Sequence, residues 1–432
     1  MIKTQLVTSF IFLLFLGSCF KESDDSPPKI VINKPSENAF FMPGDTITID
    51  AEISDNELIA GIEISLANEN FTPVLKTYTL PVHGNPEHLI FSYPLNDKYL
   101  PTGRYYVSVK ASDNYDSKNK YRAVNITGIA RRTMGLALIT HKRGGLQILS
   151  ADSALSSAVP WFSVVSDYSG SAYLPYHNIF VTTSATYGKA EAYDYFTKGR
   201  VWTLQTTAPP PFPTFTGAFA HGKYLDILYY EGKVERYNYK GIKKMTMPMP
   251  VSYMPVLTAQ TNRGVLVYAK KQYMDHKGLI ALFYNSTGAM VQSYFIDFDV
   301  VAFYARNDKE AVVLGNDKNG NALVRIYYFD ENTFSKPRDL PSGKMLCCAN
   351  PQNNIFLFVQ NGDLKELNLN DNTLFTKMPA AAFEIMKYEP VDALLYVKKG
   401  NSCVLYTYPA LQQVNSITPQ DTLLDFQIIY NL

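Results

Sequence analysis

The sequence predicts an all-β protein with a small sandwich domain followed by a larger domain of seven similar units. Short runs of alternating apolar and polar residues recur along the chain, separated by Gly, Pro, Asn and Asp. A unit of about 40–46 residues repeats through the second part of the chain. Tyr and Phe, which favour half-buried pleated surfaces, number 31 and 25 against two Trp.

Length, composition and charge limit the number of domains and the classes of partner that we expect. A chain of 432 residues is too long for one ordinary domain. With 46% hydrophobic and 18% charged residues, it can bury a core and does not have the composition of a disordered protein. The formal net charge is +1, and it becomes 0 if Lys3 is removed. Because nucleic-acid binding needs a strong basic excess, we expect no nucleic-acid partner.

Residues 1–18 have the pattern of a signal peptide, with Lys3 at the positive start and an apolar run too short to span a bilayer. The run ends in Leu16-Gly17-Ser18-Cys19, which resembles the lipobox of bacterial lipoproteins. The resemblance implies that cleavage leaves Cys19 as the mature N-terminus. Cys19 would then carry diacylglycerol and palmitate, and would anchor the protein in the outer membrane.

Residues 19–28 are polar and acidic, and such a segment cannot pack, so we expect a solvated tether. Its acidic residues Glu22, Asp24 and Asp25 resemble the export signal of Bacteroidota lipoproteins. The resemblance implies exposure at the cell surface.

Residues 29–130 predict a β-sandwich. Residues 47–53 alternate Ile or Ala with Thr, Asp and Glu, which is typical of a strand with one buried and one wet face. Seven strands are expected, at Lys29–Asn33, Ile47–Ile53, Gly61–Leu66, Val74–Leu80, His88–Tyr93, Arg104–Ala111 and Tyr121–Ile126.

The segment Gly-Arg-Tyr-Tyr-Val-Ser-Val-Lys-Ala-Ser-Asp at 103–113 resembles the penultimate strand of bacterial Ig-like and PKD-like modules. Such modules often follow the lipidated cysteine, so the resemblance implies an Ig-like sandwich. Asp55, Asp113 and Asp116 either initiate turns, which we expect, or bind Ca²⁺ at the strand ends.

Residues 131–432 contain seven units, each ending its third strand in an apolar residue. The closing residues are Leu149, Tyr195, Tyr239, Tyr284, Phe329, Leu369 and Tyr408. A four-stranded unit of this length is a propeller blade, so the sequence predicts a seven-bladed β-propeller. The resemblance to propellers is architectural, because the WD dipeptide, the kelch glycines and the Asp-box are missing.

The first and last units are incomplete in a complementary way. The first lacks an evident innermost strand, while Leu423–Tyr430 is a strand without a unit. We therefore expect Leu423–Tyr430 to pair beside Gly135–His141, which would close the ring and leave no open edge.

Basic residues outnumber acidic ones in the turns between the second and third strands, where propellers often bind ligands. A basic rim would attract anionic glycans, although hairpin tips are also commonly just polar. The candidate ligand-binding residues are Lys142, Arg143, Tyr187, Lys270, Lys271, Tyr273, His276, Lys398 and Lys399.

The sequence contains no catalytic motif, phosphate loop or zinc-spaced cysteine pair, so we expect no catalytic residues, no cofactor and no metal. Cys347, Cys348 and Cys403 are interpreted as buried apolar residues, with a disulfide to Cys403 left open.

The leading hypothesis is a surface lipoprotein whose propeller binds a glycan or an outer-membrane partner protein, as an accessory to nutrient uptake. The alternatives are a propeller-type polysaccharide lyase or glycoside hydrolase, and a scaffold subunit of an envelope complex.

Overall fold

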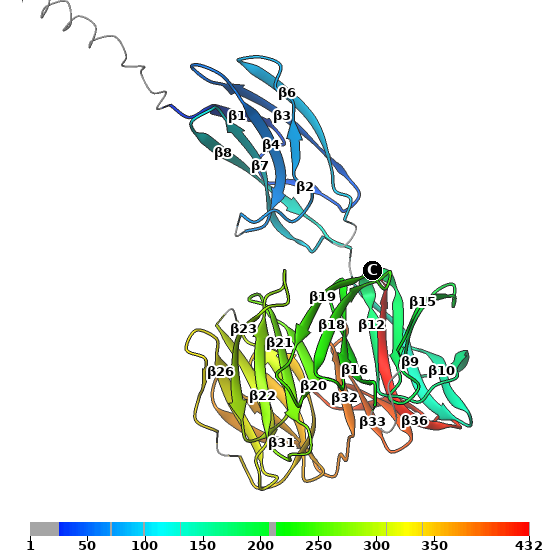
Figure 1. Ribbon diagram of the computed structural model, residues 1–432. Coiled ribbons are helices and arrows are strands. Elements are labelled where there is room, and N and C mark those ends of the chain that lie inside the picture. The colour runs from blue at the N-terminus through cyan, green and yellow to red at the C-terminus, as the bar shows by residue number, and fades with distance from the viewer. Residues whose placement is uncertain are drawn as a thin grey trace, which may run out of the picture. The chain divides into compact units, whose positions relative to one another are not determined.

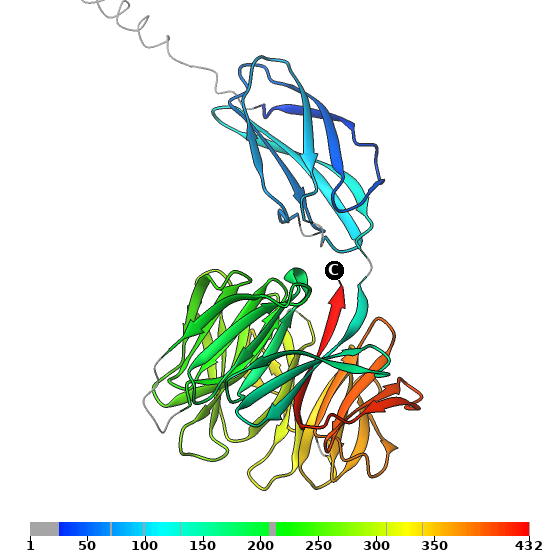
Figure 2. The same ribbon diagram turned by 90° about the vertical axis from the view of Figure 1, so that its right-hand side faces the viewer.

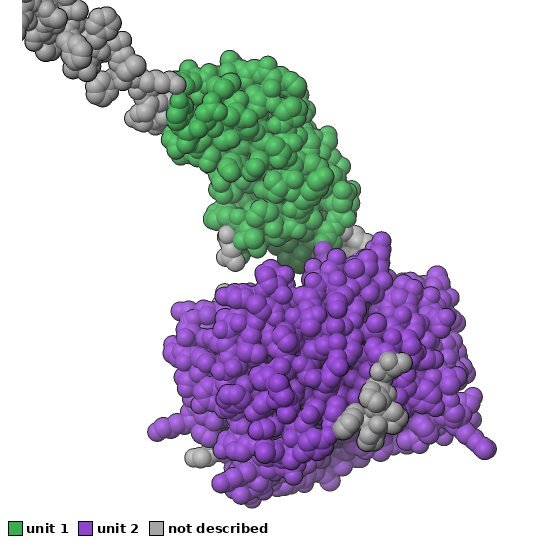
Figure 3. Space-filling model, viewed as in Figure 1, with its two compact units in different colours: residues 1–130 green, residues 131–432 purple. Residues whose placement is uncertain are grey.

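The computed structural model describes residues 26–431, except 70, 98–99, 130, 207–212, 308 and 339. The chain divides into two compact units, residues 1–130 and 131–432 (Figure 3). The predicted signal peptide, Cys19 and residues 19–25 of the tether lie outside the described residues. Within the described parts, no helix has the length and apolar character needed to cross a bilayer.

The first unit consists of two β-sheets (Figure 1). The three-stranded sheet has the order β1 (Lys29–Lys34), β3 (Thr46–Ser54), β6 (Glu87–Pro94). The five-stranded sheet has the order β2 (Ala39–Phe41), β8 (Ser117–Ile126), β7 (Gly103–Ser112), β4 (Gly61–Ala67), β5 (Tyr78–Leu80). Strand β2 runs parallel to β8, whereas the other pairs are antiparallel.

The two sheets pack face to face around one apolar core. Ile47 and Ile49 of β3 are fully buried and share a cluster with Ile64 of β4 and Val109 of β7. The alternation that predicted these strands therefore separates a core face from a solvent face. The sequence did not predict β2, because three half-exposed residues carry too short a pattern to recognise.

The second unit contains seven four-stranded sheets. The innermost strands are β12 (Gly170–Leu174), β16 (Phe215–His221), β20 (Tyr253–Gln260), β24 (Asp299–Ala305), β28 (Met345–Gln352), β32 (Ile385–Glu389) and β36 (Thr422–Asn431). The second strands are β13 (Ile179–Thr183), β17 (Tyr224–Tyr229), β21 (Val265–Lys271), β25 (Glu310–Asn316), β29 (Ile355–Gln360), β33 (Leu394–Lys399) and β9 (Arg132–Lys142).

The outer half of each sheet follows the same order. The third strands are β14 (Lys189–Asp194), β18 (Lys233–Asn238), β22 (Gly278–Phe283), β26 (Ala322–Tyr328), β30 (Asp363–Asn368), β34 (Ser402–Thr407) and β10 (Gly145–Asp152). The outermost strands are β15 (Arg200–Gln205), β19 (Lys243–Pro248), β23 (Met290–Ile296), β27 (Thr333–Phe334), β31 (Thr373–Met378), β35 (Gln413–Ile417) and β11 (Ala158–Val164). A short 3-10 turn, η1 (Pro175–His177), joins β12 to β13.

The innermost strands contact one another in sequence, and β36 contacts β12, so the sheets form a closed ring (Figure 2). This arrangement is a β-propeller. Second and third strands such as β13 and β22 are buried along their whole length, because neighbouring sheets cover both of their faces. Outermost strands such as β15 and β35 are half exposed.

The predicted repeat is confirmed in its spacing. Six of the seven expected closing residues come directly after the third strand of their sheet, and Leu149 lies inside β10. The predicted closure is also confirmed. Leu423 pairs with Thr140 and Ile429 with Gly135, so β36 is the innermost strand of the sheet that contains β9, β10 and β11.

A buried polar network joins the propeller sheet β16–β19 to the sheet β20–β23. Arg236 of β18 forms a bidentate ion pair with Asp226 of β17, through Nε at 2.6 Å and Nη2 at 2.8 Å. The imidazole of His221 lies 3.6 Å from Asp226 and 2.8 Å from the hydroxyl of Thr258 on β20. Burial lowers the pKa of His221, so the folded protein favours its neutral form.

Removal of residues 421–432 is expected to abolish folding of the propeller, since β9 would lose its inner partner. A milder variant, Phe426→Ala, deletes a fully buried ring and should lower the free energy of unfolding by about 3–5 kcal/mol. Phe375→Ala, on an exposed ring of β31, is the matched control. Chemical denaturation followed by circular dichroism measures both. A soluble truncated protein with a native-like melting transition would contradict the closure argument.

Acidification is expected to destabilise the propeller through His221. The folded-state pKa of His221 lies below the usual 6.5, so the unfolded chain takes up a proton first as the pH falls. The free energy of unfolding should therefore be highest above pH 6.5 and fall as the pH drops through the folded-state pKa. His221→Gln should reduce this slope, whereas His141→Gln, at an exposed position on β9, serves as the control. Equal slopes in wild type and His221→Gln would refute the assignment.

Candidate functional site

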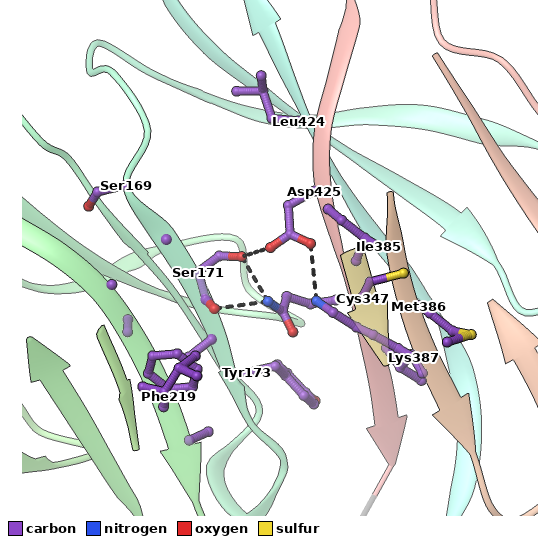
Figure 4. Close-up of a pocket in the computed structure, with 18 of the residues that line it drawn as sticks. Ser169, Ser171, Tyr173, Phe219, Cys347, Ile385, Met386, Lys387, Leu424 and Asp425 are labelled. Carbon is purple, nitrogen blue, oxygen red and sulfur yellow. Dashed lines mark hydrogen bonds and ion pairs between the residues drawn. The ribbon is translucent and has the colours of Figure 1, made fainter. Parts of the chain in front are cut away.

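The seven innermost strands surround a central channel with a volume of about 930 Å³ (Figure 4). All seven of these strands contribute lining residues. Since β-strands expose alternate side chains, each strand presents only a few positions to the channel. The volume falls within the range of ordinary small-ligand sites.

The wall of the channel is uneven. On β12 and β16 it includes small residues such as Gly170, Ser171, Gly217 and Ala218, beside the rings of Tyr173 and Phe219. A side chain at Gly170 would come within 2.9 Å of the Ala218 backbone nitrogen, so these two strands approach each other closely only because the position is glycine. The other five strands contribute larger apolar groups, namely Leu257, Val301, Leu346, Ile385, Met386 and Leu424.

One carboxylate organises the polar part of the wall. Asp425 on β36 accepts hydrogen bonds from the hydroxyls of Tyr168 at 2.6 Å and Ser171 at 3.3 Å. The ammonium of Lys387 on β32 lies 3.1 Å from its other oxygen (Figure 4). The side chain of Gln427 completes the cluster by donating to the carbonyl and hydroxyl of Ser171, at 2.8 Å each.

The position of Asp425 depends on a β-bulge. The register between β36 and β9 shifts between Leu423 and Asp425. Neighbours on a regular strand point to opposite faces, yet Leu424 and Asp425 both line the channel. The extra residue turns the carboxylate inward, as bulges commonly do near functional sites.

Burial, together with the neighbouring Asp425 carboxylate, raises the pKa of Tyr168 well above its usual range. The phenol therefore stays protonated and remains a hydrogen-bond donor. The other two charged lining residues are also engaged. Glu384 pairs with Lys398, and the Arg131 guanidinium lies 3.4 Å from the ring centroid of Tyr430.

The cysteines are not reactive in this arrangement. Cys347, Cys348 and Cys403 are all free, and the first two line the channel. Burial raises the pKa of each of the three thiols to about 12, so they stay protonated. Cys347 and Cys403 are buried and Cys348 is half-buried, which agrees with their interpretation as apolar residues. Across the described ranges, no group of three His, Cys, Asp or Glu could hold a metal ion.

Two of the three aspartates considered for calcium form turns. One carboxylate oxygen of Asp113 accepts the backbone N–H groups of Tyr115 and Asp116, at 2.5 Å each. Asp55 accepts those of Glu57 and Leu58 in the same way, at 3.0 and 3.2 Å. Both are Asx-type turns, in which the side chain replaces a backbone acceptor.

The candidate residues of the basic rim lie where the sequence placed them, at or beside the turns between second and third strands. Lys142 and Arg143 are exposed beside the β9–β10 turn, and Tyr187 is exposed before β14. The remaining six gather at two turns. Lys270 and Lys271 end β21, Tyr273 and His276 lie between β21 and β22, and Lys398 and Lys399 end β33.

Part of the rim charge is neutralised from outside these turns. Asp299, at the start of β24, lies 3.0 Å from both Lys270 and His276. Glu384, just before β32, pairs with Lys398. Asp299 and Glu384 come from the connections between sheets. They therefore lie outside the turns whose excess of basic residues predicted the rim.

Sequence reasoning did not identify the Asp425 cluster. The available signal was the carboxylate of Asp425 within the apolar run 423–430, since a charge in a buried strand needs a partner. Its partners Tyr168, Ser171 and Lys387 come from distant parts of the chain. No local pattern connects them.

No family model matches the chain, and no curated protein matches it in sequence. Several solved structures are similar in fold. A quinoprotein alcohol dehydrogenase-like protein from Bacteroides thetaiotaomicron is 13% identical with a TM-score of 0.48, covering 93% of this chain and 99% of that chain.

Two further structures are similar over a smaller part of the chain. BamB from Moraxella catarrhalis is 11% identical with a TM-score of 0.43, covering 68% of this chain and 90% of that chain. The Dos1 propeller is 11% identical with a TM-score of 0.45, covering 59% of this chain and 73% of that chain. The strand pairing of the second unit defines the propeller, and these similarities concern the fold alone.

Proposed function

We propose that this chain is a lipid-anchored binding protein of the outer membrane, exposed at the cell surface, whose propeller captures a glycan or a partner protein. In this role it would serve as an accessory to nutrient uptake. The observation that carries the proposal is the central channel, a cavity of about 930 Å³ lined mostly by small and apolar residues. Ligand sites commonly combine such walls with a few oriented polar groups, and here the Asp425 cluster supplies them.

The state of the charged groups favours binding over catalysis. A general acid must be able to release a proton to the substrate, and a general base must be able to accept one from it. Asp425 is held by Lys387, and Glu384 by Lys398. Both carboxylates are therefore ion-paired with lysines inside the protein.

The N-terminal part of the chain supports the location. Residues 1–19 carry the signal-peptide and lipobox pattern, and residues 20–28 have the polar composition of a tether. We propose that the following sandwich is Ig-like, and the parallel pairing of β2 with β8 supports this. The hydroxyl of Tyr105 on β7 donates to the carbonyl of Pro101 at 3.1 Å, as in the tyrosine corner of Ig-like domains. A sandwich of this kind would act as a spacer.

Cys19→Ser is expected to release the protein from the membrane. Without the thiol no diacylglycerol can be attached, and a single unlipidated tether gives no membrane affinity. Labelled palmitate incorporation and membrane fractionation measure the effect. Cys403→Ser, at a buried position of the propeller, is the matched control and should keep both the label and the membrane location. Unchanged palmitate labelling in Cys19→Ser would contradict the anchor assignment.

Leu346→Trp tests the channel as the site of capture. Leu346 is 51% exposed and lines the channel, so a larger ring fills the cavity without entering the core. We expect about a tenfold or greater loss of affinity for glycans on an array, or for a protein cross-linked in isolated outer membranes. Val414→Trp, 52% exposed on β35, is the control and should bind like wild type. Equal binding by both variants would exclude the channel.

A further inference from the structure

A second hollow lies at one end of the propeller sheet β20–β23, which is the fourth sheet when the one containing β9 is counted first, and we call it the blade-four groove. It has a volume of about 340 Å³ and is lined by Tyr253, Lys271, Met274, Lys277, Phe295 and Asp297. Tyr253 begins β20, Lys271 ends β21 and Phe295 lies near the end of β23. The groove therefore opens at the end of the propeller where innermost strands begin, which is also the end nearest Asp425 in β36.

Large apolar side chains are exposed around the groove. Tyr273 is 83% exposed, Phe295 63% and Met274 52%. The rings of Tyr253 and Phe295 lie 5.8 Å apart and are tilted by 50°. A soluble surface rarely gathers such groups without a binding role.

The turn that carries Tyr273 is held in an unusual conformation. Tyr273 and His276 have φ values of 61° and 55°, in the left-handed region that bulky residues rarely adopt. Hydrogen bonds maintain it. The N–H of Lys271 donates to the carbonyl of Lys277 at 2.8 Å, and that of Gln272 to Ser252 at 2.8 Å.

Tyr273 is also linked to the neighbouring sheet. Its hydroxyl hydrogen-bonds to Tyr230, which raises the pKa of Tyr230. The side-chain amide of Gln272 donates to the Tyr230 carbonyl at 2.9 Å. The exposed ring is therefore oriented before any ligand arrives. Strain of this kind is typical of binding turns, and preorganisation reduces the cost of ordering them.

The unpaired charge at the groove is positive. Lys270 and His276 already lie beside Asp299, but Lys271 and Lys277 have no carboxylate partner among the described residues. The ammonium of Lys271 instead lies 6.0 Å from the Tyr253 ring centroid. Among the side chains that line the groove, two ammonium groups accompany the single carboxylate of Asp297, a balance that favours an anionic ligand; Asp275, in the same turn, does not line the groove.

We propose that the blade-four groove binds an acidic sugar unit of a glycan. The apolar C–H face of a pyranose packs on the rings of Tyr273 and Phe295, while the sugar carboxylate pairs with Lys271 and Lys277. Asp297 accepts hydrogen bonds from hydroxyls. This inference rests on the proposed binding role of the propeller and deepens it, because it specifies the ligand class and a second place of contact.

The test uses the full mature chain, made soluble by Cys19→Ser, on an array of uronate oligosaccharides that includes oligogalacturonate and its methyl ester. The ester keeps the pyranose faces but has no carboxylate charge. We expect wild type to bind at least one uronate series and to lose about tenfold or more in affinity for Tyr273→Ala. Lys271→Gln with Lys277→Gln should abolish the preference for acid over ester and weaken the dependence on salt.

Matched variants separate the groove from the rest of the protein. Tyr284→Ala, 51% exposed just beyond the other end of β22, and Lys198→Gln, exposed between β14 and β15 of another sheet, should bind like wild type. Tyr273→Phe keeps the ring but loses its hydrogen bond to Tyr230, so we expect an affinity between those of wild type and Tyr273→Ala. Melting temperatures of all variants confirm that the fold is intact.

Three outcomes overturn the inference. If no uronate binds while Leu346→Trp still abolishes capture of another ligand, the groove assignment fails and the channel function stands. Uronate binding that is insensitive to Tyr273→Ala and to the lysine changes also refutes the groove. If wild type binds neither a glycan nor an envelope protein, the inference and the proposed function fail together.

Discussion

The propeller depends on one strand pairing. Strand β36 lies beside β9, and the backbone N–H of Arg132 donates to the side chain of Asn431, 299 residues away in the sequence. Without this contact the ring has two open edges, and each would expose unpaired backbone groups. Closing so long a loop costs chain entropy that grows only with the logarithm of its length. The burial of the apolar side chains of Leu423, Phe426 and Ile429 offsets that cost.

The same strand supplies the channel with its central carboxylate. Because β36 must both close the ring and present Asp425, its register is interrupted by a bulge at this position. The pairing resumes beyond it and continues to Asn431. Closure and site are therefore coupled, since a variant that loosens β36 would also displace Asp425 from Lys387 and Tyr168.

Much of the architecture was predictable from the sequence because it is locally encoded. Apolar second strands, tight turns such as Glu231-Gly232 and an aromatic residue after the third strand recur at regular spacing. Two strands show no such pattern and were not predicted. Strand β27 has only two residues, and β2 has three half-exposed ones. At that length neither periodicity nor propensity distinguishes a strand from a loop.

The sites were less predictable, for a physical reason. The turn 272–277 could be proposed as a candidate because its charges and its aromatic residue are adjacent in sequence. The pairing of Lys270 with Asp299, and of Lys398 with Glu384, could not, since those acids enter from connections between sheets. Composition counts charges but does not show which ones neutralise each other.

The two candidate sites differ in what they leave available to a ligand. In the channel, Asp425 has four hydrogen-bond or ion-pair partners within the protein, so its polar groups shape a cavity more than they offer contacts. At the blade-four groove the situation is reversed, with exposed rings, two lysines without a carboxylate partner among the described residues, and a strained turn. A chain can keep strain and unpaired charge at one place only if the surrounding sheet is stable. The buried strands β21 and β22 provide that support, so the groove is where a rigid scaffold presents a turn ready to bind.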